Sequence, residues 1–180
     1  MPSKSTATHY GNAAVTIHWL TAILIIALIG SGFNAGDAEN AAAKAAFLRV
    51  HIPLGVTVLV LTVVRILWWF FADKKPDPLP MPVWQDRMAR AVHLLFYIVI
   101  LGMAASGVGM MVLSGAGPII FGGSESALPD FWDFKPRFPH GIGGRLILAL
   151  FVFHAGAALY HQFVKRDGLL GRMWFPRSKD

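Results

Sequence analysis

The 180-residue sequence contains no cysteine, which removes several kinds of redox centre from consideration. Without thiolates, this chain cannot form disulfides, bind an iron–sulfur cluster through cysteine or attach a c-type haem covalently. Charged residues are also scarce, at 14 % of the chain against 55 % hydrophobic residues. A soluble domain usually carries about 25 % charged residues. The deficit of charge therefore indicates a membrane protein.

Four apolar segments are long enough to cross a bilayer, which takes about 20 helical residues. They cover residues 14–35, 47–71, 92–113 and 142–164. The sequence therefore predicts an all-α fold, a four-helix transmembrane bundle embedded in the lipid bilayer. No internal repeat or flexible linker divides the chain, so we expect residues 1–180 to form a single domain.

Lys and Arg are concentrated between the second and third segments and after the fourth. Loops rich in these residues usually stay in the cytoplasm. With four crossings, the middle connection and both chain ends share one side, so we expect both termini to be cytoplasmic. The excess of positive charge, +6 for the chain, lies largely on this predicted cytoplasmic side, where anionic lipid headgroups would attract it. No basic helix or aromatic–basic platform lies outside the predicted membrane segments, so we expect no nucleic-acid partner.

The histidines recur within the apolar segments at a spacing that predicts paired ligands. His140 and His154 are fourteen residues apart, as are His51 and Arg65. Fourteen helical residues advance about 21 Å and return a side chain to within roughly 40° of its starting face. One helix could thus offer an imidazole near each side of the bilayer. Ionisable residues inside membranes are costly and usually functional, and facing imidazoles can hold haem iron.

Depth in the bilayer limits which imidazoles can meet. His51 and His140 belong to the outer half, whereas His154 belongs to the inner half and could pair with His18 or His93. One bis-imidazole haem at each depth would satisfy these constraints, and six-coordinate iron transfers electrons rather than binding oxygen. The alternatives are a metal-ion site, proton transfer or structural hydrogen bonding. Zinc is poorly supported because no compact cluster of histidines and carboxylates appears.

Two further residues lie near the predicted inner end. The depth of Arg65 suits a propionate of an inner haem, where a bidentate contact would offset its burial. Snorkelling towards lipid headgroups is the competing explanation. His161 follows His154 by seven residues, so it lies on almost the same helix face and closer to the cytoplasm.

The motifs that carry these residues resemble the bacterial cytochrome b561 family, which includes the membrane-bound superoxide oxidase. The resemblance covers nearly the whole chain. The motifs are TIHWL around His18, RVHIPLG around His51, VVRIL around Arg65, AVHLLFYIVI around His93 and PHGIGGRLILALFVFHAGAALYHQF across His140, His154 and His161.

This resemblance implies two haem b groups in a multi-pass protein of the bacterial inner (cytoplasmic) membrane. The implied iron ligands are His51 and His140 for the outer haem, and His18 and His154 for the inner haem. His93 and His161 are then extra histidines, which could serve a quinone or a proton path.

The resemblance further implies a superoxide oxidase-like oxidoreductase that carries electrons from the outer face to the quinone pool, with ubiquinone as acceptor. Superoxide is a small anion, so three cations near His140 could steer it: Lys135, Arg137 and Arg145. Acidic residues in the same loop oppose this steering: Glu125, Asp130 and Asp133.

Two other functions remain open from the sequence. A quinol-linked cytochrome b subunit would exchange electrons with a partner redox protein, such as a periplasmic donor. A membrane anchor or assembly subunit would use haem structurally. A transporter is less consistent with the chain, because no inverted repeat or broken helix is visible.

Overall fold

The computed structural model describes residues 3–122 and 126–175, and across these ranges its regular structure is helical. The long helices are α1 (Asn12–Gly36), α2 (Ala41–Leu67), α3 (Val83–Ser114) and α5 (Arg137–Tyr160). Short elements are the π-helical turns Trp68–Ala72 and His161–Lys165, helix α4 (Gly117–Phe121) and the 3₁₀ turns Phe131–Asp133 and Leu170–Met173. Each long helix is apolar and long enough to cross a membrane. The predicted four-helix membrane fold is confirmed.

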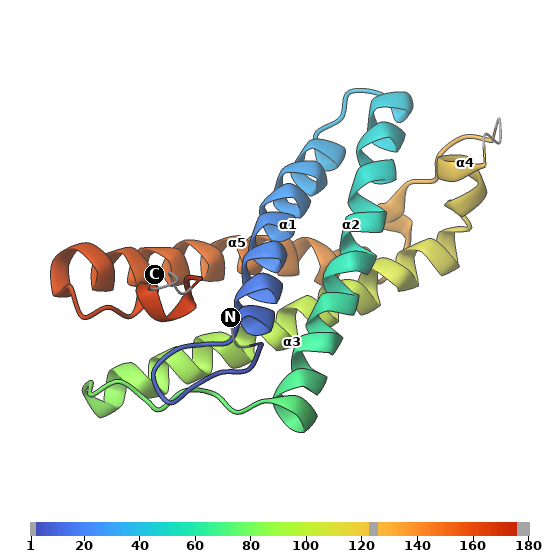
Figure 1. Cartoon of the computed structure of the whole chain (residues 1–180). Coiled ribbons are helices and arrows are strands. Elements are labelled where there is room, and N and C mark those ends of the chain that lie inside the picture. The colour runs from blue at the N-terminus through green and yellow to red at the C-terminus, as the bar shows by residue number, and fades with distance from the viewer. Residues whose placement is uncertain (1–2, 123–125, 176–180) are drawn as a thin grey trace.

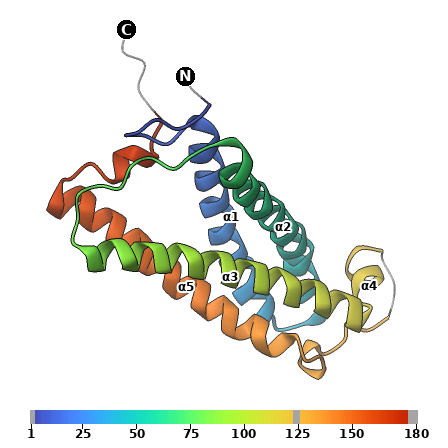
Figure 2. The ribbon, with the colours of Figure 1, turned by 90° about the horizontal axis from the view of Figure 1, so that it is seen from below.

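The long helices form two hairpins that cross each other. In Figure 1, α1 and α2 run up the picture, while α3 and α5 run across it behind them. Figure 2 shows α3 and α5 side by side, with α1 and α2 crossing behind α3. The core lies at the crossing and draws on all four long helices: Ile25, Val58, Val99, Ile147 and Leu150. The crossing therefore holds the two hairpins together through apolar contact.

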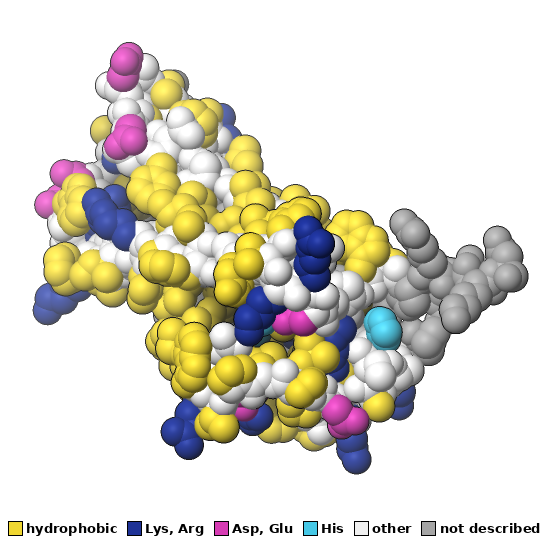
Figure 3. All heavy atoms as spheres, turned by 90° about the vertical axis from the view of Figure 1, so that its left-hand side faces the viewer, with side chains coloured by type: hydrophobic (Ala, Val, Ile, Leu, Met, Phe, Trp, Pro, Cys, Tyr) yellow, Lys and Arg dark blue, Asp and Glu magenta, His cyan; other side chains and the backbone are white. Residues whose placement is uncertain are grey.

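Most apolar side chains point away from this core. In the most apolar stretch of each long helix, between 6 % and 22 % of the residues are buried. Large side chains such as Val112 and Phe153 are 73 % and 75 % exposed. Hydrophobic side chains also cover much of the face in Figure 3, with Lys and Arg side chains standing among them. Such a surface suits lipid rather than water, and the chain is a multi-pass membrane protein.

All four long helices begin earlier than the hydropathy pattern predicts: α1 at residue 12 rather than 14, and the other three at residues 41, 83 and 137 rather than 47, 92 and 142. Hydropathy marks only the stretch that crosses hydrocarbon, whereas a helix continues wherever its backbone stays bonded. The Asn40 side chain caps α2 by accepting a hydrogen bond from the Ala43 N–H at 2.9 Å. Early in α3, the Asp86 carboxylate and the Arg90 guanidinium form an i,i+4 ion pair at 2.8 Å.

The earlier starts move three histidines deeper into helices than predicted. His51 and His93 lie well inside α2 and α3, not at the helix starts. His140, expected just before its helix, lies in the first turn of α5. These placements correct the predicted boundaries. Each ring is consequently fixed by a continuous helical backbone.

Segments from three parts of the chain meet at one end of the molecule, which we call the inner end. Arg172 joins them: its Nε donates to the Thr8 carbonyl at 2.8 Å, and its Nη2 donates to the Asp77 carbonyl at 2.7 Å. The Arg172 carbonyl accepts from the Tyr10 N–H at 3.2 Å. The start of the chain, the α2–α3 connection and the segment after α5 thus lie together, as four crossings require. The cytoplasmic location of this end stays a prediction.

Asp73 ties the first residues of the chain to the end of α2. Its carboxylate accepts hydrogen bonds from the Ser5 N–H at 3.0 and 3.1 Å, from Ser5 Oγ at 2.7 Å and from Trp68 Nε1 at 3.2 Å. Partial burial raises the pKa of Asp73, but the hydrogen bonds outweigh it and hold this pKa below its usual value. The ionised form is therefore the one that the fold stabilises.

The substitution Asp73→Asn is expected to destabilise the protein by about 1–2 kcal/mol near neutral pH, because an amide offers one acceptor oxygen and no charge. The folded pKa lies below the unfolded one, so the advantage of Asp73 is complete above the unfolded pKa and disappears as pH falls through the folded pKa. Thermal unfolding in detergent at about pH 7 and about pH 3 measures this. A difference between variant and wild type that is the same at both pH values would contradict it.

Candidate functional site

Two imidazoles face each other towards the outer end, opposite the inner end. His51 of α2 and His140 of α5 have ring centroids 6.1 Å apart, with their planes at 70°. Each ring contacts a serine through Nδ1, His51 with Ser31 Oγ at 3.1 Å and His140 with Ser106 Oγ at 2.9 Å. The structure thus brings together the predicted outer pair and adds one serine to each ring.

The serines determine which ring nitrogen carries the proton. Ser31 Oγ donates to the Ala27 carbonyl at 2.8 Å, and Ser106 Oγ donates to the Met103 carbonyl at 2.9 Å. Each hydroxyl has one hydrogen, so it accepts from the imidazole Nδ1–H. The lone pair of each neutral ring is then on Nε2. Metal-binding histidines usually have this arrangement, with the second ring nitrogen donating to a polar group.

Glycines leave room for the two outer rings. A Cβ atom at position 32 would lie 2.9 Å from Cε1 of His51, which is closer than real contacts allow. At position 107, a Cβ would lie 3.4 Å from Cε1 of His140. Neither the serines nor Gly32 were singled out from the sequence, because they lie on helices other than those of the rings that they contact.

Three imidazoles meet towards the inner end. His18 of α1 and His154 of α5 have centroids 6.1 Å apart at 67°. His93 of α3 lies closer to His154, at 5.3 Å and 81°. His93 Nδ1 also donates to the Ala89 carbonyl at 2.6 Å. The structure therefore brings both predicted candidates to His154.

Both 6.1 Å separations fit an iron atom between two imidazoles. A metal–nitrogen bond of about 2 Å on each side, with each ring centroid about 1 Å behind its nitrogen, places the centroids about 6 Å apart. The pairs His51–His140 and His18–His154 meet this requirement. The His93–His154 separation is shorter than it. Each of these two pairs is therefore spaced to hold an iron atom between its rings.

Arg65 lies beside the inner imidazoles. Its Nη1 is 3.2 Å from His18 Nδ1. Arginine has only donors, so this nitrogen of His18 accepts, and the proton of a neutral His18 is on Nε2. The Nε of Arg65 is buried without a hydrogen-bond partner among the described residues. A buried donor without a partner is costly and fits an anion absent from the structure.

The predicted steering residues separate into a close pair and an exposed lysine. The Arg145 Nη1 donates to the Gly141 carbonyl at 3.1 Å, and a Cβ at position 141 would lie 3.0 Å from Arg137 Nη1 and 3.9 Å from Arg145 Nη1. Two guanidinium groups therefore flank the residue after His140. Lys135 is exposed.

Of the three acidic residues expected to oppose this steering, two lie among the described residues. The Asp130 side chain accepts from the Trp132 N–H at 2.9 Å, so it caps a 3₁₀ turn beside the Arg137 guanidinium, which stacks on Trp132 at 4.3 Å. Asp133 belongs to the same turn. Glu125 lies outside the described residues.

A carboxylate that the sequence analysis missed pairs with His161. His161 Nδ1 and Asp167 Oδ2 are 2.5 Å apart. The six-residue spacing of the two residues matches neither a helix nor a strand, so periodicity gives no signal for it. The glycine at position 168, where the chain reverses, is the one sequence feature that marks the turn.

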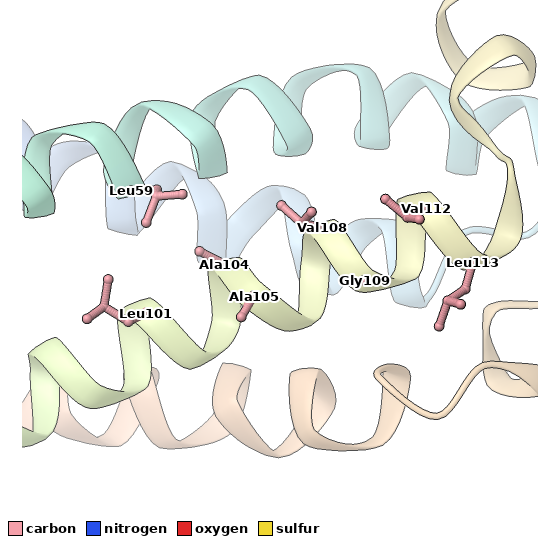
Figure 4. A pocket seen from close by; sticks show the side chains of 8 residues that line it. All are labelled: Leu59, Leu101, Ala104, Ala105, Val108, Gly109, Val112 and Leu113. Carbon is pink, nitrogen blue, oxygen red and sulfur yellow. The ribbon is translucent and has the colours of Figure 1, made fainter.

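An apolar groove runs between α2 and α3 (Figure 4). Leu59 of α2 and Leu101, Val108 and Leu113 of α3 are among its lining residues. All eight lining residues are apolar or glycine, and none is a predicted site residue. The groove is therefore part of the surface that suits lipid, and the chemistry of the chain lies among the histidines.

The prokaryotic cytochrome b561 family matches residues 9–176, nearly the entire chain. The chain belongs to this family. Its members are membrane electron-transfer proteins, so the chain is a membrane cytochrome that binds haem b and acts as an oxidoreductase.

Curated relatives from three bacteria match over nearly their whole length. Cytochrome b561 homolog 1 of Escherichia coli (strain K12) is 27 % identical over 176 residues, 94 % of this chain and 98 % of its own. Cytochrome b562 of Cereibacter sphaeroides is 31 % identical over 173 residues, 93 % of this chain and 96 % of its own. A Yersinia pestis protein named "Probable superoxide oxidase CybB" is 28 % identical over 171 residues, 91 % of this chain and 94 % of its own.

The close approach at Gly32 predicts a specific effect on haem content. Gly32→Ala should displace the His51 ring and lower the haem-to-protein ratio, because the added methyl group contacts the ring at 2.9 Å. Gly30→Ala is the matched control, since a Cβ there meets nothing within 4 Å. Both substitutions favour the helix by about 1 kcal/mol, so stability does not separate them. Equal haem content in the two purified variants would contradict the prediction.

Proposed function

We propose that this cytochrome is a di-haem b oxidoreductase of the bacterial inner membrane that passes electrons from the outer face to the quinone pool. Its most concrete form is a superoxide:ubiquinone oxidoreductase. The observation that supports it is the pair of 6.1 Å imidazole separations at two depths, His51 with His140 and His18 with His154. A b haem held by such a pair would supply one-electron transfer.

The outer histidines are suited to hold a haem as they stand. Ser31 and Ser106 already hold His51 and His140 with Nε2 free to coordinate. Gly32 and Gly107 keep the surrounding space clear of other side chains. This half of the protein therefore supports the predicted outer ligands directly.

The inner ligands require Arg65 to change partner. If His18 held iron through Nε2, the proton of a neutral His18 would be on Nδ1, where it would oppose the Arg65 donor 3.2 Å away. The Arg65 guanidinium, whose Nε has no partner among the described residues, would then be available to hold a haem propionate. This favours the propionate role of Arg65 over snorkelling. His93 remains the competing partner of His154, and its Nδ1–H already donates to Ala89.

At the outer face, Arg137 and Arg145 present two positive charges beside His140, with Lys135 nearby in sequence. Exposed cations raise the local concentration of a small anion and speed its arrival. The overall reaction balances when two superoxide anions, one ubiquinone and two protons give two oxygen molecules and one ubiquinol. The protons are taken up towards the inner end, for which His161 and His93 are the candidate carriers.

The proposed stoichiometry predicts two non-covalent b haems per chain. His51→Ala and His140→Ala should each remove the outer haem, whereas His18→Ala and His154→Ala should remove the inner one. Pyridine haemochrome analysis gives the haem-to-protein ratio, and redox titration identifies which haem is lost. His9→Ala, at an exposed position before α1, is the control and should retain both haems. Loss of the inner haem in His93→Ala, with its retention in His18→Ala, would reject the pairing proposed here.

Superoxide should reduce the haems of the purified protein rapidly, and ubiquinone should reoxidise them. Replacing Lys135, Arg137 and Arg145 with glutamine should slow the first step and flatten its salt dependence, because exposed charges are screened over about 8–10 Å. The second step should be unaffected. The matched control replaces three exposed cations elsewhere: Lys4, Lys74 and Arg87.

The outcomes of this experiment separate the competing functions. Wild-type protein that superoxide does not reduce excludes superoxide as the donor. Reduction by ubiquinol would then favour a subunit that serves a partner redox protein. If haem reduction by superoxide slows equally in the steering variant and the control, the steering role of Lys135, Arg137 and Arg145 is rejected, but superoxide is not excluded as the donor.

A further inference from the structure

The inner end of α5 holds His161 in a turn that brings Asp167 back to it. The π-helical turn His161–Lys165 is followed by Arg166 and Gly168, whose φ angles of 54° and 76° are left-handed. This reversal places Asp167 Oδ2 at 2.5 Å from His161 Nδ1. The two side chains are 14 % and 34 % exposed. The imidazole is thus mostly shielded from water, whereas Asp167 lies at the surface.

Both carboxylate oxygens of Asp167 have a partner. Oδ1 accepts from the Leu169 N–H at 3.2 Å, and Oδ2 faces the imidazole. Burial raises the pKa of Asp167, but the hydrogen bonds from His161 and Leu169 and the nearby positive charges bring this pKa below its usual value. An ionised carboxylate only accepts, so His161 carries a proton on Nδ1. Its Nε2 is therefore the nitrogen that can exchange protons.

The position of His161 suits proton transfer towards the inner imidazoles. It follows His154 by seven residues, about 10 Å along α5 and on nearly the same face. It therefore lies between the inner imidazole cluster and the inner end. Its neighbours include the Tyr160 ring, with centroids 6.0 Å apart at 90°. The ammonium of Lys165 in the same turn donates to Gln85 of α3 at 3.2 Å.

We propose that Asp167 is a positioning residue that orients His161 to deliver protons to the quinone, an inference that rests on the proposed ubiquinone reduction. His161 protonated on both nitrogens gives its Nε2 proton to a reduced quinone oxygen, forming an O–H bond and leaving a neutral ring with Nδ1–H on Asp167. Water at the inner end returns a proton to Nε2. Two such transfers, with two electrons from two superoxide anions, convert the quinone to the quinol.

The substitution Asp167→Asn tests this role with little change of structure, because the amide oxygen can still accept from the Leu169 N–H. Superoxide-driven haem reduction should be unchanged. Reoxidation by ubiquinone should slow about tenfold, and the pH at which its rate is half maximal should fall, because the imidazolium loses its countercharge. Asp86→Asn, which removes a carboxylate of the same exposed fraction paired with Arg90, is the matched control and should leave both steps unchanged.

Nitrogen NMR of histidine-labelled protein gives a readout independent of turnover. Wild-type His161 should show the Nδ1–H tautomer, and Asp167→Asn should show a mixture of tautomers. An unchanged ubiquinone step and pH profile in Asp167→Asn, or an Nε2–H tautomer in the wild type, would overturn the inference. If superoxide reduces the wild-type haems but ubiquinone does not reoxidise them, both the proton role of His161 and the assignment of ubiquinone as acceptor are overturned. A normal ubiquinone step that Asp167→Asn leaves intact overturns the positioning role alone.

Discussion

The arrangement of the outer pair depends on giving Nδ1 of each ring a hydrogen-bond partner within an apolar bundle. An unpaired polar group in hydrocarbon costs several kcal/mol, so neighbouring helices must supply hydrogen bonds to these rings. At the outer pair, α1 supplies Ser31 and α3 supplies Ser106, each to a ring from another helix. The positions of all four helices are thereby linked to the orientation of two rings.

The two ends meet this requirement differently. The outer rings, His51 and His140, each donate from Nδ1 to a serine hydroxyl, which leaves Nε2 available. At the inner end, His18 instead accepts from a guanidinium, which can only donate. The outer pair is thus organised for a ligand, whereas the inner pair must rearrange with Arg65 when it binds one. A site whose side chains are already in place loses less free energy on binding, so the outer site should bind its haem more tightly than the inner site.

The four helices and the outer pair could be predicted from the sequence, because apolar length and histidine depth are local properties of the chain. Helix starts were less predictable, since capping by Asn40 and ion pairing by Asp86 extend helices beyond the hydrocarbon. The supporting residues Ser31 and Gly32 could not be assigned, because their contacts depend on how two helices align across the bundle. Asp167 was missed because a left-handed turn, which has no periodic pattern, brings it to His161.

The contacts made by Arg172 also limit when the inner end can assemble during synthesis. This residue follows the last long helix, yet it bonds Thr8 and Asp77 near the beginning and middle of the chain. Nearby, the Trp19 indole donates to the Met173 carbonyl at 2.8 Å, next to His18. During synthesis these bonds cannot form until Arg172 has left the ribosome, after all four long helices have been made. The segments at the inner end are thus joined to one another only once every long helix exists.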